Sequence, residues 1–195
     1  MTGKQARSLQ TYERVLDAAA FEFAQQGYPN TNLQRVAERT GLTKGALYGH
    51  FSSKEELAAA LVKRLDEAVR TLADSADDPH APAWEKLRSL TFSLADRLHT
   101  DIRVTAALRL VLDSAKAGAE PPAVLSQLRD YAVRLVGDAQ REQDISPELP
   151  PETVADLLLA VLFGAHCTAP VSGWKELPSR VRGMWDILAP VLRHR

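Results

Sequence analysis

Residues 31–57, TNLQRVAERTGLTKGALYGHFSSKEEL, contain two short helical patterns separated by a turn. Thr31 followed three residues later by Gln34 predicts a capping box that starts the first helix, and Gly41 predicts its end. Thr43 is a good N-cap for a second, shorter helix. Two capped helices joined by a tight turn form a helix-turn-helix, in which the first helix braces the second and the second enters the major groove of DNA.

The second helix of this motif is so short that only a few side chains can face a duplex. Lys44 can reach a guanine edge or a phosphate, and Gly45 lets the backbone come close to the DNA. Tyr48 and, at the start of the next helix, Lys54 can hold phosphates. The predicted DNA-binding residues are Thr31, Gln34, Thr43, Lys44, Gly45, Tyr48, His50 and Lys54. The alternative is an ordinary helical hairpin with a solvated basic face.

The flanking sequence predicts two further helices around this motif. Before it, a helix over about residues 8–26 ends at Gly27. Its inward side chains are expected to be Val15, Ala18, Ala19, Phe21 and Phe23, and those of the short second helix of the motif Ala46, Leu47 and Phe51. After the motif, Ser53 and Glu56 form a second capping box, from which a helix with apolar residues four apart, Leu57, Leu61 and Leu65, runs to about Leu72.

The rest of the chain also follows the helical period, and no segment alternates as a strand would. Five more helices are expected, around residues 87–98, 104–112, 125–135, 151–168 and 181–192. Loops are expected over residues 73–82, 117–122 and 145–151, where prolines gather. The fold class is therefore all-α with about nine helices. We expect residues 1–53 to form a helix-turn-helix DNA-binding domain and residues 54–195 a larger domain that binds a ligand and dimerises.

Composition and charge limit the classes of function. The chain has 195 residues, 45% of them hydrophobic, which suffices for a real core. Its single cysteine, the absence of a leader pattern and a longest apolar run of residues 157–165 predict a cytoplasmic protein without membrane contact. Residues 1–64 hold nine Lys or Arg against six Asp or Glu, and the remainder hold fifteen against nineteen. A basic start on an acidic body favours a nucleic-acid partner, although such a difference also arises by chance.

Catalysis is not expected, and neither a cofactor nor a metal is. His166 and Cys167 are adjacent, so on a helix they point in different directions, and a buried histidine beside a small core cysteine is the preferred interpretation. The other histidines form no metal-binding spacing, and no glycine-rich phosphate loop or nucleophile elbow occurs. A helical interaction module without DNA binding remains an alternative, but it would not explain the basic capped hairpin.

The stretch from Gly41 to Leu57 resembles the DNA-binding signature of the TetR repressor family, and the resemblance covers about the first 65 residues, including Gly27-Tyr28. It implies a nine-helix, all-α homodimer that sits on a palindromic operator in double-stranded DNA and is released by a small lipophilic effector. In this family the last two helices pack against the same two helices of the second subunit. The residues that this implies for the dimer interface are Leu157, Leu158, Val161, Leu162, Trp185, Leu188 and Leu192, with closure of the monomer core as the alternative role.

A narrower resemblance extends past residue 65 to the γ-butyrolactone receptors of antibiotic-producing bacteria. It rests on Thr43–Tyr48, Leu90–Phe92, Leu108–Leu110, the Pro121-Pro122 pair and Met184–Leu188. It implies an effector such as a γ-butyrolactone, butenolide or furan that controls secondary metabolism and antibiotic biosynthesis. The alternative is a repressor that senses another lipophilic compound or an antibiotic, in efflux or stress control.

Two positions depart from the pattern of these receptors. Leu128 stands where several of them have a tryptophan associated with the pocket, so the indole N–H is lost and the effector is expected to differ in shape or polarity. Gly49 replaces a phenylalanine after Tyr48, which changes the surroundings of His50. The predicted ligand-binding residues are Thr91, Leu94, Leu108, Leu112, Leu128, Tyr131 and Cys167. Each apolar one has plain core packing as its alternative role, and Thr91 and Tyr131 are expected to orient the ligand.

Overall fold

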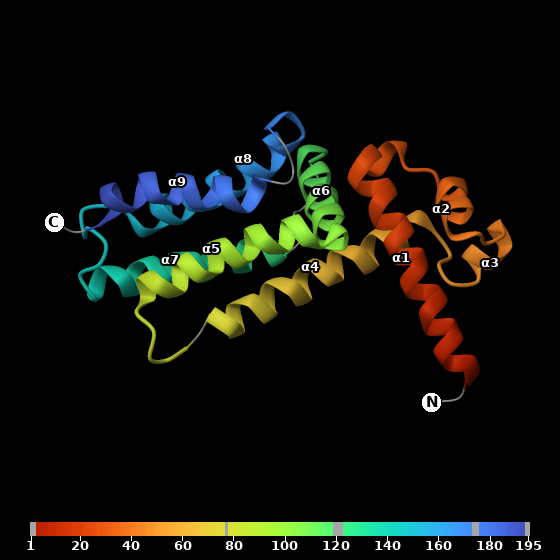
Figure 1. Ribbon diagram of the computed structural model, residues 1–195, viewed down its shortest axis with the longest axis horizontal. Coiled ribbons are helices and arrows are strands. Elements are labelled where there is room, and N and C mark those ends of the chain that lie inside the picture. Colours follow the sequence, from red (N-terminus) through yellow and green to blue (C-terminus); the bar gives the residue numbers. More distant parts are fainter. Residues whose placement is uncertain (1–2, 77, 119–122, 173–175, 194–195) are drawn as a thin grey trace. The chain divides into compact units, whose positions relative to one another are not determined.

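The computed structural model describes residues 3–76, 78–118, 123–172 and 176–193 (Figure 1). Within these ranges the chain forms nine α-helices and no strand, apart from one isolated bridge between Ile145 and Arg193. The helices are α1 (Gly3–Asn30), α2 (Leu33–Thr40), α3 (Lys44–Tyr48), α4 (Lys54–Ala76), α5 (Ala83–Thr100), α6 (Ile102–Lys116), α7 (Ala123–Arg141), α8 (Pro151–Ser172) and α9 (Leu177–Leu192). The all-α fold predicted from the helical period is confirmed.

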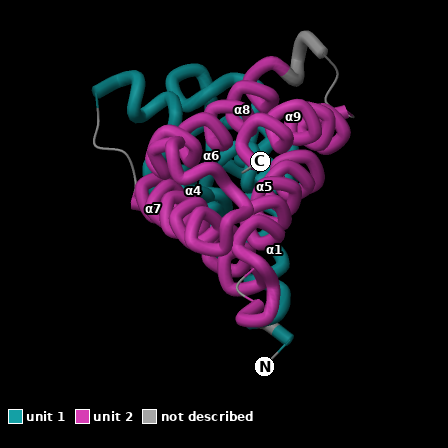
Figure 2. The backbone as a smooth tube through the Cα atoms, turned by 90° about the vertical axis from the view of Figure 1, so that its left-hand side faces the viewer, with its two compact units in different colours: residues 1–67, 101–122 teal, residues 68–100, 123–195 magenta. Residues whose placement is uncertain are grey.

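The chain packs as two compact units, which Figure 2 colours separately. Unit 1 spans residues 1–67 and 101–122, so it contains α1, α2, α3, the first part of α4 and α6. Unit 2 spans residues 68–100 and 123–195 and contains the end of α4 with α5, α7, α8 and α9. The compact units therefore divide the chain differently from the expected functional boundary between residues 53 and 54, which stays a prediction.

In unit 1, helix α1 packs along α6 and against α2, and α2 packs on α3. The core is built from fully buried side chains such as Leu16, Phe23 and Leu57, and the Phe51 ring stacks on Tyr12 with 4.7 Å between ring centres. Two predicted core residues are wrong. Phe21 is 39% exposed, with the Arg39 guanidinium 3.8 Å from its ring centre, and Ala46 is exposed.

Helix α1 is interrupted at Gly27, where φ is 71° and ψ is 173°. This conformation is open to glycine and almost closed to other residues. The predicted end of the helix at this glycine is confirmed as a break, but one more turn follows it, to Asn30, and the helix starts at Gly3 rather than near residue 8. A Cβ atom at Gly27 would lie 3.0 Å from Asp113 Oδ2 and 3.2 Å from an Arg109 nitrogen, so α6 approaches the backbone closely here.

Ion pairs tie α6 to α1 near the start of α6. The Arg103 guanidinium donates to the Glu13 carboxylate, to the Glu13 carbonyl at 3.0 Å and to Asp17 Oδ1 at 2.7 Å. Arg64 of α4 donates to the same Glu13 carboxylate at 2.8 Å. Further along, Arg109 Nη1 donates to the Ala24 carbonyl at 2.6 Å. The Glu13 carboxylate of α1 thus accepts hydrogen bonds from arginines of two other helices, α4 and α6.

In unit 2, helix α5 packs on α7, α8 and α9, while α8 packs on both α7 and α9. Its aromatic centre joins α5 to α9: the Trp185 ring lies 4.9 Å from Trp84 and 5.7 Å from Phe92, measured between ring centres. At the surface, Arg129 of α7 pairs with Asp156 of α8 at 2.6 Å. The unit therefore has an aromatic and aliphatic core of its own.

This core corrects part of the predicted dimer interface. Leu158, Leu162, Trp185 and Leu192 are buried within the single chain, so for these four the alternative role, closure of the monomer core, holds. Leu157 is 40% exposed, and Val161 and Leu188 are partly exposed. Helices α8 and α9 are apolar around much of their surface, so their sequence alone did not separate the inward face from the outward one.

His166 and Cys167 lie on different sides of α8. His166 is buried as expected, and this burial lowers the pKa of its imidazole. Cys167 is exposed, so its prediction as a small core residue is wrong. Neighbouring positions on a helix are separated by about 100°, and this rotation brings one side chain inward and the next outward.

Two predicted loops are shorter than expected or lie partly outside the described residues. Helix α4 continues through the start of the loop predicted for residues 73–82, to Ala76, and residue 77 is outside the described part. The break predicted at residue 117 is confirmed at the end of α6, where the N–H groups of Ala117 and Gly118 donate to carbonyls of the last turn. Residues 119–122, with the Pro121-Pro122 pair, are outside the described residues.

Candidate DNA-binding surface and ligand-binding residues

The N-cap of α2 is Asn32 and not Thr31. The Asn32 side-chain oxygen accepts from the Gln34 backbone N–H at 2.8 Å, whereas the Thr31 hydroxyl is buried and donates to the Gly27 carbonyl at 2.8 Å. The predicted capping box of Thr31 and Gln34 is therefore wrong. The Gln34 side chain is exposed and donates to Glu38 at 3.1 Å. Of the two predicted DNA contacts, the structure leaves Gln34 accessible and Thr31 inaccessible.

The turn after α2 is the one predicted. Gly41 has φ 69° and ψ 18°, a left-handed conformation that favours glycine, and its N–H donates to α2 carbonyls. Two arginines fix α2 on α1. Arg39 pairs with the nearly buried Glu22 carboxylate at 3.1 Å, and Arg14 donates to the Thr40 carbonyl at 2.8 Å. Both bonds fix the last turn of α2 on α1.

Helix α3 has five residues and one fully buried anchor. The Thr43 hydroxyl oxygen accepts from the Ala46 N–H at 3.2 Å, which confirms Thr43 as the N-cap. Leu47 has no exposed surface, while Lys44 and Gly45 are exposed and Tyr48 is 42% exposed. The structure therefore brings Lys44, Gly45 and Tyr48 together at the exposed surface of one short helix, whereas Gln34 lies on α2.

Helix α4 starts with a modified capping box. The Ser53 hydroxyl oxygen accepts from the Glu56 N–H at 3.2 Å, as predicted. The Glu56 carboxylate, however, accepts from the N–H of Ser52 at 2.7 Å and from its hydroxyl at 2.8 Å, one residue earlier than in a standard box. These bonds from Ser52 lower the pKa of Glu56, which stays ionised at the positive end of the helix.

Lys54 connects the start of α4 to the end of α1. Its ammonium donates to the Pro29 carbonyl at 3.2 Å and lies 4.6 Å from the centre of the Tyr28 ring. Partial burial lowers the pKa of Lys54, against a smaller opposite effect of Glu55. The Tyr28 hydroxyl donates to Glu55 at 2.8 Å, and burial together with this acceptor raises the pKa of Tyr28. Lys54 thus has a structural role, and its contact with a phosphate stays a prediction.

A polar depression adjoins this connection. It is lined by the turn of residues 29–33, by Tyr48 at the end of α3, and by residues 52–55 at the start of α4. Backbone N–H groups at a helix start and neighbouring hydroxyls are suited to an anionic oxygen. The Ser52 N–H and hydroxyl in this depression already donate to Glu56, and the acidic Glu55 also lines it, so its contact with a DNA backbone stays a prediction.

The predicted ligand-binding residues are distributed over both units. Leu108 and Leu112 belong to α6 in unit 1, whereas the other five belong to unit 2. Within unit 2, Leu94 and Leu128 are buried and Cys167 is exposed. Both hydroxyls expected to orient a ligand already donate to carbonyls, that of Thr91 to Leu87 at 2.9 Å and that of Tyr131 to Ala73 at 3.3 Å. Each can therefore only accept from a ligand while these bonds persist.

Two exposed residues of α9 were missed. Ile187 is 74% exposed and Val191 is 72% exposed, and they lie four positions apart on one face of the helix. The four-residue spacing of Ile187 and Val191 is visible in the sequence. The prediction, however, took only Trp185, Leu188 and Leu192 as the apolar face of this helix. Leu157 of α8 is also 40% exposed, so α8 and α9 together carry three exposed large apolar side chains among the described residues.

The described residues show neither a metal cluster nor a membrane span. No group of three or more His, Cys, Asp or Glu side chains among them is placed to hold a metal ion. No helix within the described ranges is long and apolar enough to cross a bilayer.

An all-α fold in which a braced five-residue helix exposes a cation, a glycine and a tyrosine defines a helix-turn-helix DNA-binding regulator. Comparison with known proteins gives the family. The family model described as "Bacterial regulatory proteins, tetR family" matches residues 15–61. The A-factor receptor protein of Streptomyces griseus is 29% identical over 193 residues, covering 98% of this chain and 67% of that protein.

Solved structures agree over nearly the whole chain. CprB of Streptomyces coelicolor A3(2), a TetR family protein, is 30% identical with a TM-score of 0.87, and the match covers 96% of this chain and 90% of CprB. A gamma-butyrolactone receptor (ArpA-like protein) is also 30% identical, with a TM-score of 0.79 and coverage of 95% of this chain and 90% of the other. The chain belongs to the TetR family. It is a TetR-type transcriptional regulator, and its relatives are regulators rather than enzymes.

Proposed function

We propose that this chain is a homodimeric repressor that binds a palindromic operator through α3 and releases it when a γ-butyrolactone, butenolide or furan binds in the larger domain. The observation that carries the DNA-binding part is the exposed face of α3 above a single buried anchor, Leu47. Lys44, at the first position of α3, is placed to read a guanine edge or hold a phosphate. CprB, at 31% identity in a second structure, was solved in complex with its operator sequence, which supports this assignment.

The dimer is proposed to form through α8 and α9. The exposed apolar residues Leu157, Ile187 and Val191, with the partly exposed Val161 and Leu188, would meet their counterparts across a twofold axis. Such a dimer would present two copies of α3, and two helices about 34–36 Å apart match successive major grooves on one side of the duplex. A palindromic operator follows from this symmetry.

The class of effector is proposed from the relatives and from the residues that resemble those of γ-butyrolactone receptors. The buried Leu128, where several such receptors have a tryptophan, keeps an apolar wall without an indole donor. An effector that relies less on that hydrogen bond is therefore expected. A different lipophilic compound or an antibiotic is the alternative ligand, and it would leave the repressor assignment unchanged.

Release requires that the effector bind one state of the dimer better than the other. A coupling of about 1–3 kcal/mol would weaken operator binding about 5- to 150-fold, which is enough to free a promoter. Helix α4 contributes residues to both compact units, so it is the element through which the two sites are proposed to communicate.

The experiment is a selection of random duplexes on the purified protein, followed by gel shifts with and without γ-butyrolactones, butenolides and furan carboxylic acids. A palindrome released by one of these classes supports the whole proposal. A palindrome that none of them releases leaves the repressor and contradicts the effector class. Failure to select any duplex contradicts the DNA-binding role and favours a helical interaction module.

A further inference from the structure

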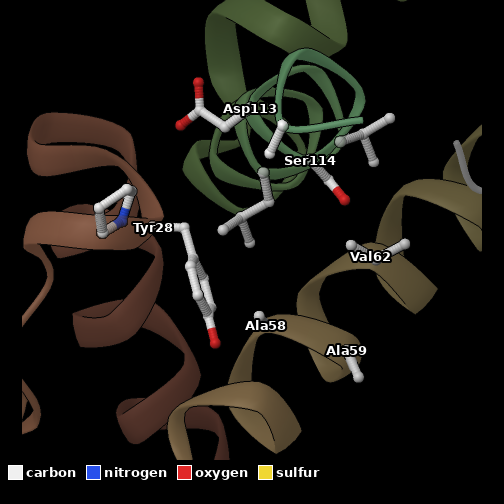
Figure 3. A pocket seen from close by; sticks show the side chains of 10 residues that line it. Tyr28, Ala58, Ala59, Val62, Asp113 and Ser114 are labelled. Atoms are coloured by element: carbon white, nitrogen blue, oxygen red, sulfur yellow. The ribbon is translucent and has the colours of Figure 1, made fainter. Parts of the chain in front are cut away.

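Unit 1 contains a cavity that the proposed repressor mechanism does not use. It has a volume of about 350 Å³ and lies between the end of α1, the first half of α4 and the second half of α6 (Figure 3). All of its lining residues belong to unit 1. The cavity is large enough for a small organic molecule, because ligand sites in proteins begin at about 300 Å³.

The walls of this cavity are mostly carbon. The Tyr28 ring forms one side, Ala58, Ala59 and Val62 of α4 form another, and Leu110 contributes from α6. The space exists because Ala58, the residue of α4 beside the tyrosine ring, carries only a methyl group, while the Ala59 methyl points away from the ring (Figure 3). A flat ring can therefore lie against Tyr28 without displacing a large side chain.

The charged groups nearest the cavity are directed elsewhere. The Asp113 carboxylate is turned away from α4 (Figure 3), toward Gly27 and the Arg109 guanidinium, with 3.8 Å between Oδ2 and Nε. Ser114 in contrast turns its hydroxyl toward the space between α6 and α4 (Figure 3). The cavity thus offers an apolar volume with one neutral hydroxyl, which disfavours an ionised ligand because nothing would replace its hydration.

We infer that this cavity is a second ligand site, which binds a small, neutral, ring-containing molecule with a hydroxyl or carbonyl group. The ring packs on Tyr28 and Ala58 of α4, and the polar group bonds to Ser114. None of its lining residues is among those predicted to bind the effector, although Leu108 and Leu112 of that set lie on the same helix, α6. It also adjoins the connection that fixes the start of α4, since the hydroxyl of Tyr28 bonds to Glu55 and its ring contacts Lys54.

Titration calorimetry of the full chain with 1-naphthol tests this inference without DNA. 1-Naphthalenesulfonate, which has the same ring with a charge in place of the hydroxyl, is the ligand control. Ala58→Phe places a ring in the cavity from a half-exposed position of α4 beside Tyr28 (Figure 3). Ala115→Phe is the control, because Ala115 is exposed, follows Ser114 and does not line the cavity.

The inference expects that the wild-type chain binds 1-naphthol and that the Ala58→Phe variant binds one molecule fewer per chain. The Ala115→Phe variant should bind like the wild type, and Ser114→Ala should bind about 5- to 10-fold more weakly, the effect of one lost hydrogen bond. The sulfonate should not compete for the site. An absence of 1-naphthol binding, or equal stoichiometry in the Ala58→Phe variant, overturns the inference.

This result is independent of the repressor assignment. If no operator is selected but Ala58→Phe removes one molecule of 1-naphthol, the second ligand site is supported and the DNA-binding role is contradicted. If the operator and effector are found and 1-naphthol binds equally to both phenylalanine variants, the repressor assignment is supported and the second ligand site is contradicted.

Discussion

Replacing Arg103 with alanine is expected to destabilise unit 1 more than replacing Arg64, which bonds to the same Glu13 carboxylate. The Arg103 side chain is only 18% exposed and donates to both the carboxylate and the carbonyl of Glu13, and to Asp17 at 2.7 Å. Hydrogen bonds to charged groups contribute about 1.5–3 kcal/mol when partly buried, against about 0.2–1 kcal/mol for an exposed pair. Because the Asp17 side chain is 59% exposed, its bond belongs to the second class. We expect a loss of about 2–3 kcal/mol in the free energy of unfolding.

The assay is urea unfolding followed by circular dichroism, with Arg64→Ala as the matched control. Arg64 bonds to the same Glu13 carboxylate at 2.8 Å, but its side chain is 39% exposed. Its loss should therefore cost less than about 1 kcal/mol, and added salt should shrink this smaller effect further. Hydrogen exchange of α6 amides locates the destabilisation if the two units unfold in separate steps.

The reasoning would be refuted by equal losses in the two variants. Equal losses would mean that solvent screens Arg103 as fully as Arg64, and that apolar packing alone holds α6 on α1. A larger loss in the free energy of unfolding for Arg64→Ala would mean that the contact of Glu13 with α4 stabilises unit 1 more than its contact with α6.

Three further predictions concern other parts of the chain. Lys44→Ala should weaken operator binding by about 1–3 kcal/mol and lower the salt dependence, while Lys63→Ala, an equal change of charge on α4, should have little effect in the same gel shift. Gly27→Ala should destabilise the fold by about 1–3 kcal/mol in urea unfolding, since only glycine readily adopts φ 71° with ψ 173°; Gly183→Ala, within helix α9, should not. Because burial lowers the pKa of His166 below its ordinary 6.5, the unfolded chain binds this proton more tightly, so stability should fall as the pH drops below about 6.5, by at most about 1.4 kcal/mol per pH unit. Melting temperatures across this range should depend less on pH in His166→Asn, and an unchanged profile would contradict the assignment.

The helix-turn-helix could be predicted from the sequence because its decisive residues act locally. Thr43 caps α3, Gly41 ends α2, and Leu47 is the apolar residue that a short amphipathic helix must bury. Capping and left-handed turns depend on a few neighbouring residues, so the sequence contains the necessary information. The helical period predicted the rest of the all-α fold in the same way.

The errors arose where a choice depended on distant parts of the chain. Thr31 and Asn32 are both good caps, and Asn32 is selected because the break at Gly27 presents a carbonyl to the Thr31 hydroxyl. Phe21 is apolar, but the packing of α2 leaves it beside Arg39 at the surface. Neither contact is visible in local spacing.

The dimer-interface prediction mixed two kinds of apolar residue for a general reason. A residue that fills the core of one chain and a residue that meets a partner have the same chemistry. Only the fold shows that Trp185 lies among aromatic rings of its own chain, whereas Ile187 is left outside. The cavity in unit 1 likewise depends on three helices meeting, and no motif in the sequence indicates it.

The single anchor of α3 has a consequence for evolution. Leu47 holds the helix from beneath, while the side chains that face outward take no part in the core. Exchanging outward residues changes stability by about 0.5 kcal/mol or less, so new combinations are tolerated by the fold. After a gene duplication, two copies of such a regulator can therefore diverge in the residues of this outward face while the scaffold beneath it is inherited intact.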